Sequence, residues 1–256
     1  PFRMKKENEC RRDSFPKRDR IPAVNFWIIF ILNLVFILIT SQSKGQKIDS
    51  LKLLIPFKHG LEQYDVLYDL AYEFMETDYK TGLNYASEAL KIAEKFGDSL
   101  RIVKAGRIKS YALVRLGKVD SSILVSLVIL PIAMRNNYFD QLKHILNRLG
   151  SAYVFKAEYD KALDYYFQSH QLREKYGDKF ELSVTLNNIG YVFFKLEDYD
   201  KALSYYTQSL NLKNEIENKY DLDILLINLS LCYTYKEDYS KARDFVDLAF
   251  SLCRSN

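Results

Sequence analysis

The sequence predicts an all-α fold, a solenoid of about five helical hairpins, on three observations. The first is self-similarity: "EYDKALDYYFQSHQLREKYGD" at residues 158–178 returns forty residues later as "DYDKALSYYTQSLNLKNEIEN" at residues 198–218. The second is composition, because only 9 Gly and 5 Pro stand beside 20 Tyr and 16 Phe, and few helix breakers favour long helices. The third is apolar spacing at i, i+3, i+4 and i+7, which marks one face of a helix.

Five units result when the chain is laid out with this period. They are residues 63–102, 103–142, 143–182, 183–222 and an incomplete 223–256, after a short lead-in at residues 46–62. A column of small residues runs through the units as Gly82, Ser122, Ala162, Ala202 and Ala242. One hairpin cannot cover its own apolar face, whereas stacked hairpins can. The repetition therefore predicts that each unit forms a core with its neighbours.

Each unit is predicted to hold two helices. The first helix of the third unit has its apolar spacing at Leu146, Leu149, Gly150 and Tyr153, and the second helix has it at Tyr159, Ala162, Leu163 and Tyr166. Two helices approach within about 8–10 Å only where their side chains are small. We expect Gly150 and Gly190 on first helices, and Ala162 and Ala202 on second helices, to permit this approach.

The ends of the predicted helices carry capping residues. An acidic residue precedes the second helix of four units, where a carboxylate can accept backbone N–H bonds: Asp78, Glu158, Asp198 and Asp238. Two units close with "FGD" at residues 96–98 and "YGD" at residues 176–178. Gly97 and Gly177 suit a left-handed position after a helix, and the Asp that follows each can cap the next helix.

These residues resemble the tetratricopeptide repeat (TPR) family. The resemblance rests on Leu-x-x-(Leu/Ile)-Gly-x-x-(Tyr/Phe) followed by Tyr-Asp-Lys-Ala-Leu-x-Tyr-Tyr, and it covers residues 63–256, most clearly 143–256. It implies a TPR-type right-handed α-α superhelix. The period exceeds the usual value of about 34 residues, as in the longer repeats of bacterial sensory and regulatory proteins. Pro131 within the second helix of the second unit predicts a kink, so this unit is either a place of bending or partner contact, or a divergent repeat.

The resemblance implies protein or peptide binding on the concave face, which the first helices line. The positions that match this face are Lys104, Arg107, Tyr111, His144, Asn147, Ser151, Asn187, Tyr191, Phe194, Lys195, Asn228 and Tyr235. Arg107, Asn147 and Asn187 occupy one column of the repeat, and such a ladder can hydrogen-bond the main chain of an extended peptide. The alternatives are a hydrated groove without a partner and a groove filled by a neighbouring copy.

The sequence carries no signature of an enzyme. It has no phosphate-binding glycine loop and no Gly-x-Ser-x-Gly motif. His59, His144 and His170 lie far apart and match no metal-ligand spacing. Cys232 and Cys253 are expected about 13 Å apart along an antiparallel hairpin, too far for a disulfide. We therefore predict no catalytic residues, no metal site, no cofactor and no disulfide.

The basic excess of the chain is confined to its N-terminal segment. Residues 1–45 hold nine Lys and Arg against four Asp and Glu, so the rest of the chain is close to neutral although the net charge is +4. Without a basic surplus, residues 46–256 are not expected to bind nucleic acid. Residues 21–43 carry no charge and have the apolar core "FWIIFILNLVFILI", followed by "SQSKG". This order predicts a bacterial signal peptide cleaved near Gly45, with an uncleaved membrane anchor as the alternative.

Two classes of function remain for such a chain. One is a non-catalytic interaction module in the periplasm or cell envelope, as the sensory input part of a larger signal-transduction protein. The other is an intracellular scaffold or peptide-responsive regulator with a membrane anchor. An enzyme comes third. In each of the first two classes the expected partner is a protein or extended peptide, and contact with a membrane would come only through residues 21–43.

Overall fold

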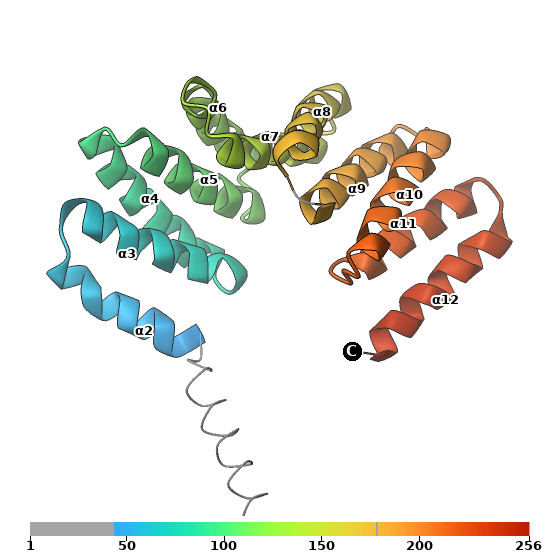
Figure 1. The fold of residues 1–256 in the computed structure, drawn as a ribbon, viewed down its shortest axis with the longest axis horizontal. Helices are drawn as coiled ribbons and strands as arrows, with labels where there is room; N and C mark the ends of the chain where they lie inside the picture. The colour runs from blue at the N-terminus through green and yellow to red at the C-terminus, as the bar shows by residue number, and fades with distance from the viewer. Residues whose placement is uncertain (1–43, 178, 256) are drawn as a thin grey trace, which may run out of the picture. The chain divides into compact units, whose positions relative to one another are not determined.

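The structure is a computed structural model that describes residues 44–177 and 179–255, and every regular element in these ranges is a helix. Ten α-helices form five antiparallel hairpins (Figure 1). The hairpins are α3 (Gly60–Glu73) with α4 (Tyr79–Phe96), α5 (Ser99–Arg115) with α6 (Val119–Arg135), α7 (Phe139–Phe155) with α8 (Tyr159–Tyr176), α9 (Lys179–Lys195) with α10 (Tyr199–Glu215), and α11 (Leu222–Tyr235) with α12 (Tyr239–Ser255). The predicted all-α solenoid of five hairpins is confirmed. Helices α5, α7 and α9 each begin four residues before the unit boundary drawn from the sequence.

Three further short helical segments belong to the lead-in and to the first hairpin. Helix α2 (Lys44–Leu54) and the 3-10 helix η1 (Ile55–Phe57) precede α3, and η2 (Phe74–Glu76) follows it. Within the described part of the chain, no helix has both the length and the apolar character that crossing a membrane requires. The predicted signal peptide or anchor at residues 1–45, with its apolar run at 21–43, falls almost wholly outside the described residues.

Helices stack in chain order, each against the one before and the one after. The first helices of the hairpins also contact one another, through the pairs α3 and α5, α5 and α7, α7 and α9, and α9 and α11. The second helices make no comparable contacts with one another among the described residues. Odd-numbered helices therefore form one continuous face of residues 48–255, which we call the inner face.

Glycines on the inner helices receive tyrosine rings from the second helices, as the small columns predicted. A Cβ added to Gly150 would lie 2.6 Å from the ring of Tyr166, and one added to Gly190 would lie 2.7 Å from the ring of Tyr206. In the second hairpin the same two positions hold Ser110 and Ser126. The hydroxyl oxygen of Ser110 lies 2.6 Å from that of Ser126 and 2.8 Å from that of Ser122, and all three serines are buried. The space that a ring fills in two hairpins is thus closed by hydrogen-bonded serines in another.

Three of the four predicted carboxylate caps are confirmed. Asp78, Asp198 and Asp238 each accept a hydrogen bond from a backbone N–H in the first turn of the helix that follows. The prediction for Glu158 is wrong, because its side chain caps no backbone N–H. Its longer side chain instead receives the ammonium of Lys161 at 2.6 Å.

The two glycines predicted to be left-handed behave differently. Gly97 has φ 66° after α4, and Asp98 accepts a backbone N–H bond of α5, so both predictions are confirmed. Gly177 is extended, with φ −98° and ψ 174°, so the left-handed prediction is wrong there. A Cβ on Gly177 would lie 2.6 Å from the backbone oxygen of Arg173, so close approach and not positive φ requires glycine. Asp178, the second predicted cap, lies outside the described residues.

Helix α6 runs without interruption from Val119 to Arg135 and contains Pro131. The kink and the partner contact expected at this hairpin stay predictions. Cys232 is a free, buried thiol on α11. The side chain of Cys253 lies outside the described part of the structure.

Candidate functional site

A ladder of asparagine side chains joins the inner helices α7, α9 and α11. Asn188 on α9 donates from Nδ2 to Oδ1 of Asn147 on α7 at 3.2 Å. Asn228 on α11 donates in the same way to Oδ1 of Asn187 on α9, again at 3.2 Å. These four residues, which we call the amide ladder, place the predicted residues Asn147, Asn187 and Asn228 together on one face.

The amide ladder keeps capacity for further hydrogen bonds. Each asparagine amide has two N–H donors and an oxygen with two lone pairs. Each bond between helices uses one N–H of one amide and one lone pair of the other. The remaining donors and acceptors are half-buried on the inner face, where an extended backbone could use them.

One step earlier along the inner face, arginines replace the amides. Arg107 on α5 is equivalent to Asn147, and Arg148 on α7 is equivalent to Asn188. Arg107 donates from Nε to Oε1 of Gln141 at 3.0 Å. The guanidinium of Arg148 lies over the ring of Tyr111, 4.2 Å from its centroid. Its Nε is buried and has no hydrogen-bond partner among the described residues.

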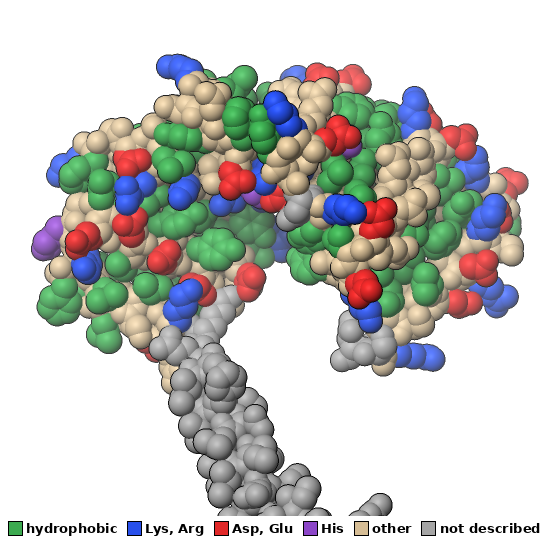
Figure 2. Space-filling model, in the orientation of Figure 1, with side chains coloured by type: hydrophobic (Ala, Val, Ile, Leu, Met, Phe, Trp, Pro, Cys, Tyr) green, Lys and Arg blue, Asp and Glu red, His purple; other side chains and the backbone are tan. Residues whose placement is uncertain are grey.

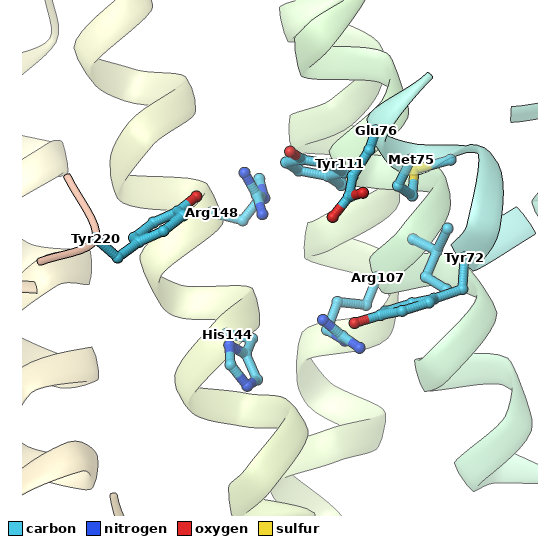
Figure 3. A pocket seen from close by; sticks show the side chains of 9 residues that line it. Tyr72, Met75, Glu76, Arg107, Tyr111, His144, Arg148 and Tyr220 are labelled. Atoms are coloured by element: carbon cyan, nitrogen blue, oxygen red, sulfur yellow. The ribbon is translucent and has the colours of Figure 1, made fainter. Parts of the chain in front are cut away.

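A pocket of about 460 Å³ opens at this arginine step. Figure 3 shows Arg107 and Arg148 approaching it from neighbouring inner helices, with tyrosine rings on either side. Its lining residues are Tyr72, Met75, Glu76, Arg107, Ile108, Tyr111, His144, Arg148 and Tyr220. The structure therefore gathers three predicted residues, Arg107, Tyr111 and His144, in one pocket.

Burial shapes the electrostatics of this pocket. Burial, which is the largest cause, and the positive charge of Arg107 together lower the pKa of Arg148 to about 10. The guanidinium still carries its proton at neutral pH. Burial followed by the charges of Arg107, Arg173 and Lys143 lowers the pKa of His144 to about 3. The imidazole is thus neutral at pH 7, and its Nε2 lies 3.3 Å from Oε1 of Glu181.

Charge elsewhere on the surface is mixed. Figure 2 shows Lys and Arg interspersed with Asp and Glu over the face in view, with hydrophobic side chains between them. The buried ammonium of Lys143 lies 2.9 Å from Asp140 and 2.8 Å from Glu181. Arg101 contacts two carboxylates, those of Asp65 and Asp98. In the pocket, Arg107 and Arg148 share the lining with one carboxylate, that of Glu76.

Two predicted residues lie on the inner helices but outside the pocket and the ladder. Lys104 lines a smaller pocket of about 200 Å³ between α3 and α5. Ser151 lies 3.0 Å from the hydroxyl of Tyr166, and its Oγ also donates to the backbone oxygen of Asn147 at 3.1 Å. Ser151 therefore orients a core tyrosine and is only partly available to a ligand.

The remaining predicted residues form aromatic contacts toward the C-terminal end of the inner face. Phe194 and Tyr235 pack edge to face, with ring centroids 5.5 Å apart, and Tyr199 stacks on Tyr235 at 5.1 Å. Lys195 lies over Tyr191, with Nζ 5.5 Å from the ring centroid. Tyr191 and Phe194 are half-buried, whereas Tyr235 and Lys195 are exposed.

Sequence reasoning missed several lining residues of the pocket. Arg148 follows Asn147 directly and occupies the same position of the repeat as Asn188 and Asn228. It is the charged residue at that position, so a comparison of two adjacent repeat positions would have found it. Tyr220 gave no signal, because it lies between α10 and α11 and reaches the pocket only through the arrangement of the hairpins. Among the described residues, no group of three or more His, Cys, Asp or Glu could hold a metal ion.

The decisive comparison is with a family model. The model described as tetratricopeptide repeat matches residues 141–215 and, in a second overlapping placement, residues 181–255. Residues 141–255 belong to the tetratricopeptide repeat family. The first two hairpins continue the same fold on the N-terminal side of these repeats. A comparison with curated protein sequences finds no match.

Solved structures share the fold of the TPR solenoid. BtubC (BKLC) from P. vanneervenii is similar at 21% identity over 83% of this chain and 89% of that chain, with a TM-score of 0.68. A signal transduction ATPase with numerous domains (STAND) from Pyrococcus horikoshii, which has a tetratricopeptide repeat sensor, is similar at 19% identity over 88% of this chain and 35% of that chain, with a TM-score of 0.72. NprR in complex with its cognate peptide NprX is similar at 18% identity over 93% of this chain and 70% of that chain, with a TM-score of 0.66. At these identities the likeness shows the fold alone.

Proposed function

We propose that this protein is a non-catalytic TPR module that binds a protein segment or extended peptide along its inner face. The observation that carries the proposal is the amide ladder, in which Asn147, Asn188, Asn187 and Asn228 present unused donors and acceptors from successive inner helices. An extended backbone offers N–H and C=O groups along its length. The amide ladder can therefore fix the backbone while the tyrosines beside it hold side chains.

The fold relatives support a signalling role for this module. NprR, which has a similar fold, has been solved in complex with its cognate peptide, and the STAND protein has a tetratricopeptide repeat sensor. Because the chain spans about a third of the STAND relative, a sensory input role within a larger bacterial signal-transduction protein belongs to the proposal. The alternative is a membrane-anchored scaffold or regulator inside the cell, which would use the same face.

Export to the cell envelope is a separate part of the proposal. It is supported by the charge-free residues 21–43 with a basic segment before them and "SQSKG" after them. We expect N-terminal sequencing of the envelope-associated protein to begin close to Gln46. Recovery of the intact N-terminus in a membrane fraction would favour the anchored alternative.

The proposed binding face is tested by a triple variant of the full chain, Arg107→Ala, Asn147→Ala and Asn187→Ala. A neutral hydrogen bond contributes about 0.5–1.5 kcal/mol, so each single change should weaken peptide capture roughly 3- to 10-fold, and the triple change should abolish it. The assay is capture on an array of random peptides, with circular dichroism to verify that helicity is retained.

A matched control removes the same chemistry from exposed positions on second helices. It combines Arg135→Ala, Asn84→Ala and Asn211→Ala, all on α4, α6 or α10 and all exposed. The control should capture peptides as the wild type does. If the folded triple variant keeps every wild-type peptide, the binding surface lies elsewhere and the proposal fails.

A further inference from the structure

Helix α6 carries an apolar stripe on a side that α8 and α10 keep largely polar. Its exposed apolar residues, which we call the outer stripe, recur at helical spacing and are Leu124, Leu127, Val128, Pro131 and Met134. The equivalent residues of α8 are Asp164, Phe167, Gln168, Gln171 and Glu174. The equivalent residues of α10 are Ser204, Thr207, Gln208, Asn211 and Asn214. Packing within the solenoid therefore does not require apolar residues at these positions.

The outer stripe is open to solvent. The relative exposure is 65% for Leu124, 63% for Val128 and 55% for Met134. Helix α6 packs against α5 and α7, and Figure 1 shows it at the edge of the stack above these two helices. Single exposed apolar side chains are ordinary, whereas a contiguous set of them marks an interaction site. The outer stripe thus calls for a partner.

A pocket lies beside the outer stripe, where α4, α5 and α6 meet. Its volume is about 240 Å³, and its walls include the apolar side chains of Leu90, Ile102 and Val128. Glu94 and Lys109 are its charged lining residues. A pocket of this kind, next to an exposed apolar surface, accepts one aliphatic side chain of a partner.

The outer stripe is symmetric about a point midway between Leu127 and Val128. Leu124 and Pro131 lie equally far from this point along the helix. A second α6 that runs antiparallel across the first therefore presents the same residues in reverse order. Leu127 of one copy then meets Val128 of the other, beside the pocket, and Leu124 meets Pro131. An apolar residue meets an apolar residue at each of these contacts.

The charges at the two ends of α6 fit the same arrangement. Asp120 and Arg135 are both exposed, and they too lie equally far from the midpoint. Antiparallel copies place each Asp120 beside Arg135 of the other copy, whereas parallel copies would place like charges together. Lys156 donates to Oδ1 of Asp120 at 2.8 Å, which leaves Oδ2 to accept from a guanidinium. The pattern of charge is thus complementary to itself.

We propose that the outer stripe binds a second copy of this chain, with the two α6 helices antiparallel about a two-fold axis near Leu127 and Val128. Such a contact uses the same patch on both copies and so covers both outer stripes at once. A membrane surface fits less well, because helices that lie on membranes surround their apolar side with basic residues, and Asp120 and Glu94 border this one. The dimer keeps the inner face of each copy out of the contact.

The test measures the mass of the full chain by sedimentation in a mild non-ionic detergent. We expect the wild type to sediment as a dimer at micromolar concentration. A triple variant, Leu124→Ser, Leu127→Thr and Val128→Gln, gives α6 the residues that α10 has at these positions. Its dimer should dissociate more than about 100-fold more readily, because three apolar side chains of each copy lose their burial. Every variant keeps residues 21–43, so the comparison isolates α6.

A charge reversal tests the antiparallel arrangement. Arg135→Asp places two acids together at both ends of the contact and should weaken the dimer about 3- to 30-fold, because exposed ion pairs each contribute little. The further change Asp120→Arg restores opposite charges and should recover most of the loss. Arg135→Ala removes the pair without adding repulsion and should keep the dimer.

A matched control removes an exposed apolar side chain from another second helix. Leu248 on α12 occupies the position of Val128 and is also exposed. Leu248→Gln should leave the dimer as it is in the wild type. If Leu248→Gln dissociates the dimer as strongly as Val128→Gln does, the contact is not specific to α6 and the proposal fails.

The remaining outcomes separate this inference from the proposed function. A monomeric wild type, or a dimer that persists in the folded triple variant, overturns the proposal. Val128→Gln alone gives the same test if circular dichroism shows the triple variant to be unfolded. A dimer that the double charge reversal does not restore overturns the antiparallel arrangement. Peptide capture by the inner face should be the same in the folded monomeric variant, so a failed dimer leaves the peptide-binding proposal standing.

Discussion

Replacing Gly190 by alanine should destabilise this protein, although alanine is the better helix former. The new Cβ would lie 2.7 Å and 2.8 Å from two ring carbons of Tyr206, which is closer than packed carbons allow. Tyr206 has 0% of its surface exposed, so the ring has no solvent to move into. Overpacking costs about 1–3 kcal/mol, and the propensity gain of Gly to Ala is about 1 kcal/mol. The expected net loss in the free energy of unfolding is therefore about 0–2 kcal/mol.

The sign should reverse once the ring is removed. In a Tyr206→Ser background the alanine meets no ring, so Gly190→Ala should stabilise by about 1 kcal/mol through helix propensity alone. The chain itself shows that such a pair can pack, because Ser110 and Ser126 hold the equivalent positions in the second hairpin. The difference between the two backgrounds isolates the contact of Gly190 with Tyr206.

The assay is urea unfolding followed by the helical signal in circular dichroism, for the wild type, both single variants and the double variant. Ser204→Ala at an exposed position of α10 reports propensity without a change in packing. The packing argument would be refuted if Gly190→Ala stabilised the wild type by as much as it stabilises the Tyr206→Ser variant.

Three other predictions rest on single side chains. Tyr206→Phe should stabilise by about 1–3 kcal/mol because the Tyr206 hydroxyl is buried and has no hydrogen-bond partner among the described residues. Tyr166→Phe should instead destabilise by about 0.5–1.5 kcal/mol because that hydroxyl lies 3.0 Å from Ser151, and equal effects of the two changes in urea unfolding would contradict this. Ala202→Leu, at a position with 0% exposure, should lower stability by about 1–3 kcal/mol, and an unchanged melting temperature would refute the small-column assignment. The pKa of His144 is lowered from 6.5 to about 3 in the folded protein. Below pH 6.5 the unfolded chain therefore binds a proton at His144 that the folded chain does not, and the free energy of unfolding falls as the pH drops toward 3. His144→Gln should flatten that part of a curve of stability against pH, and an unchanged slope would exclude His144 as a cause.

Much of the fold could be predicted because its determinants are local. Helical spacing, carboxylate caps and small residues act within a few positions of the chain, and the forty-residue period repeats them. The errors at Glu158 and Gly177 are also local: a longer side chain reached a lysine instead of the backbone, and a tight approach to Arg173 required glycine without a positive φ. Residue type alone does not distinguish these alternatives.

The candidate site was predicted only in part, because its geometry depends on contacts between hairpins. The column of Arg107, Asn147 and Asn187 was visible as a repeat, but its bonding to the next column, through Asn188 and Asn228, depends on how far one helix is shifted along another. Arg148 and Tyr220 likewise reach the pocket only through the arrangement of the hairpins. Neither side chain stands in the column from which the site was predicted.

Photo-crosslinking followed by mass spectrometry tests the proposed binding face most directly. A peptide captured by the full chain is resynthesised with a photoreactive residue at each position in turn, and the adducts are mapped. The account predicts adducts on α5, α7 and α9, at or beside Arg107, Asn147 and Asn187. Adducts confined to α6, α8 and α10 would contradict it.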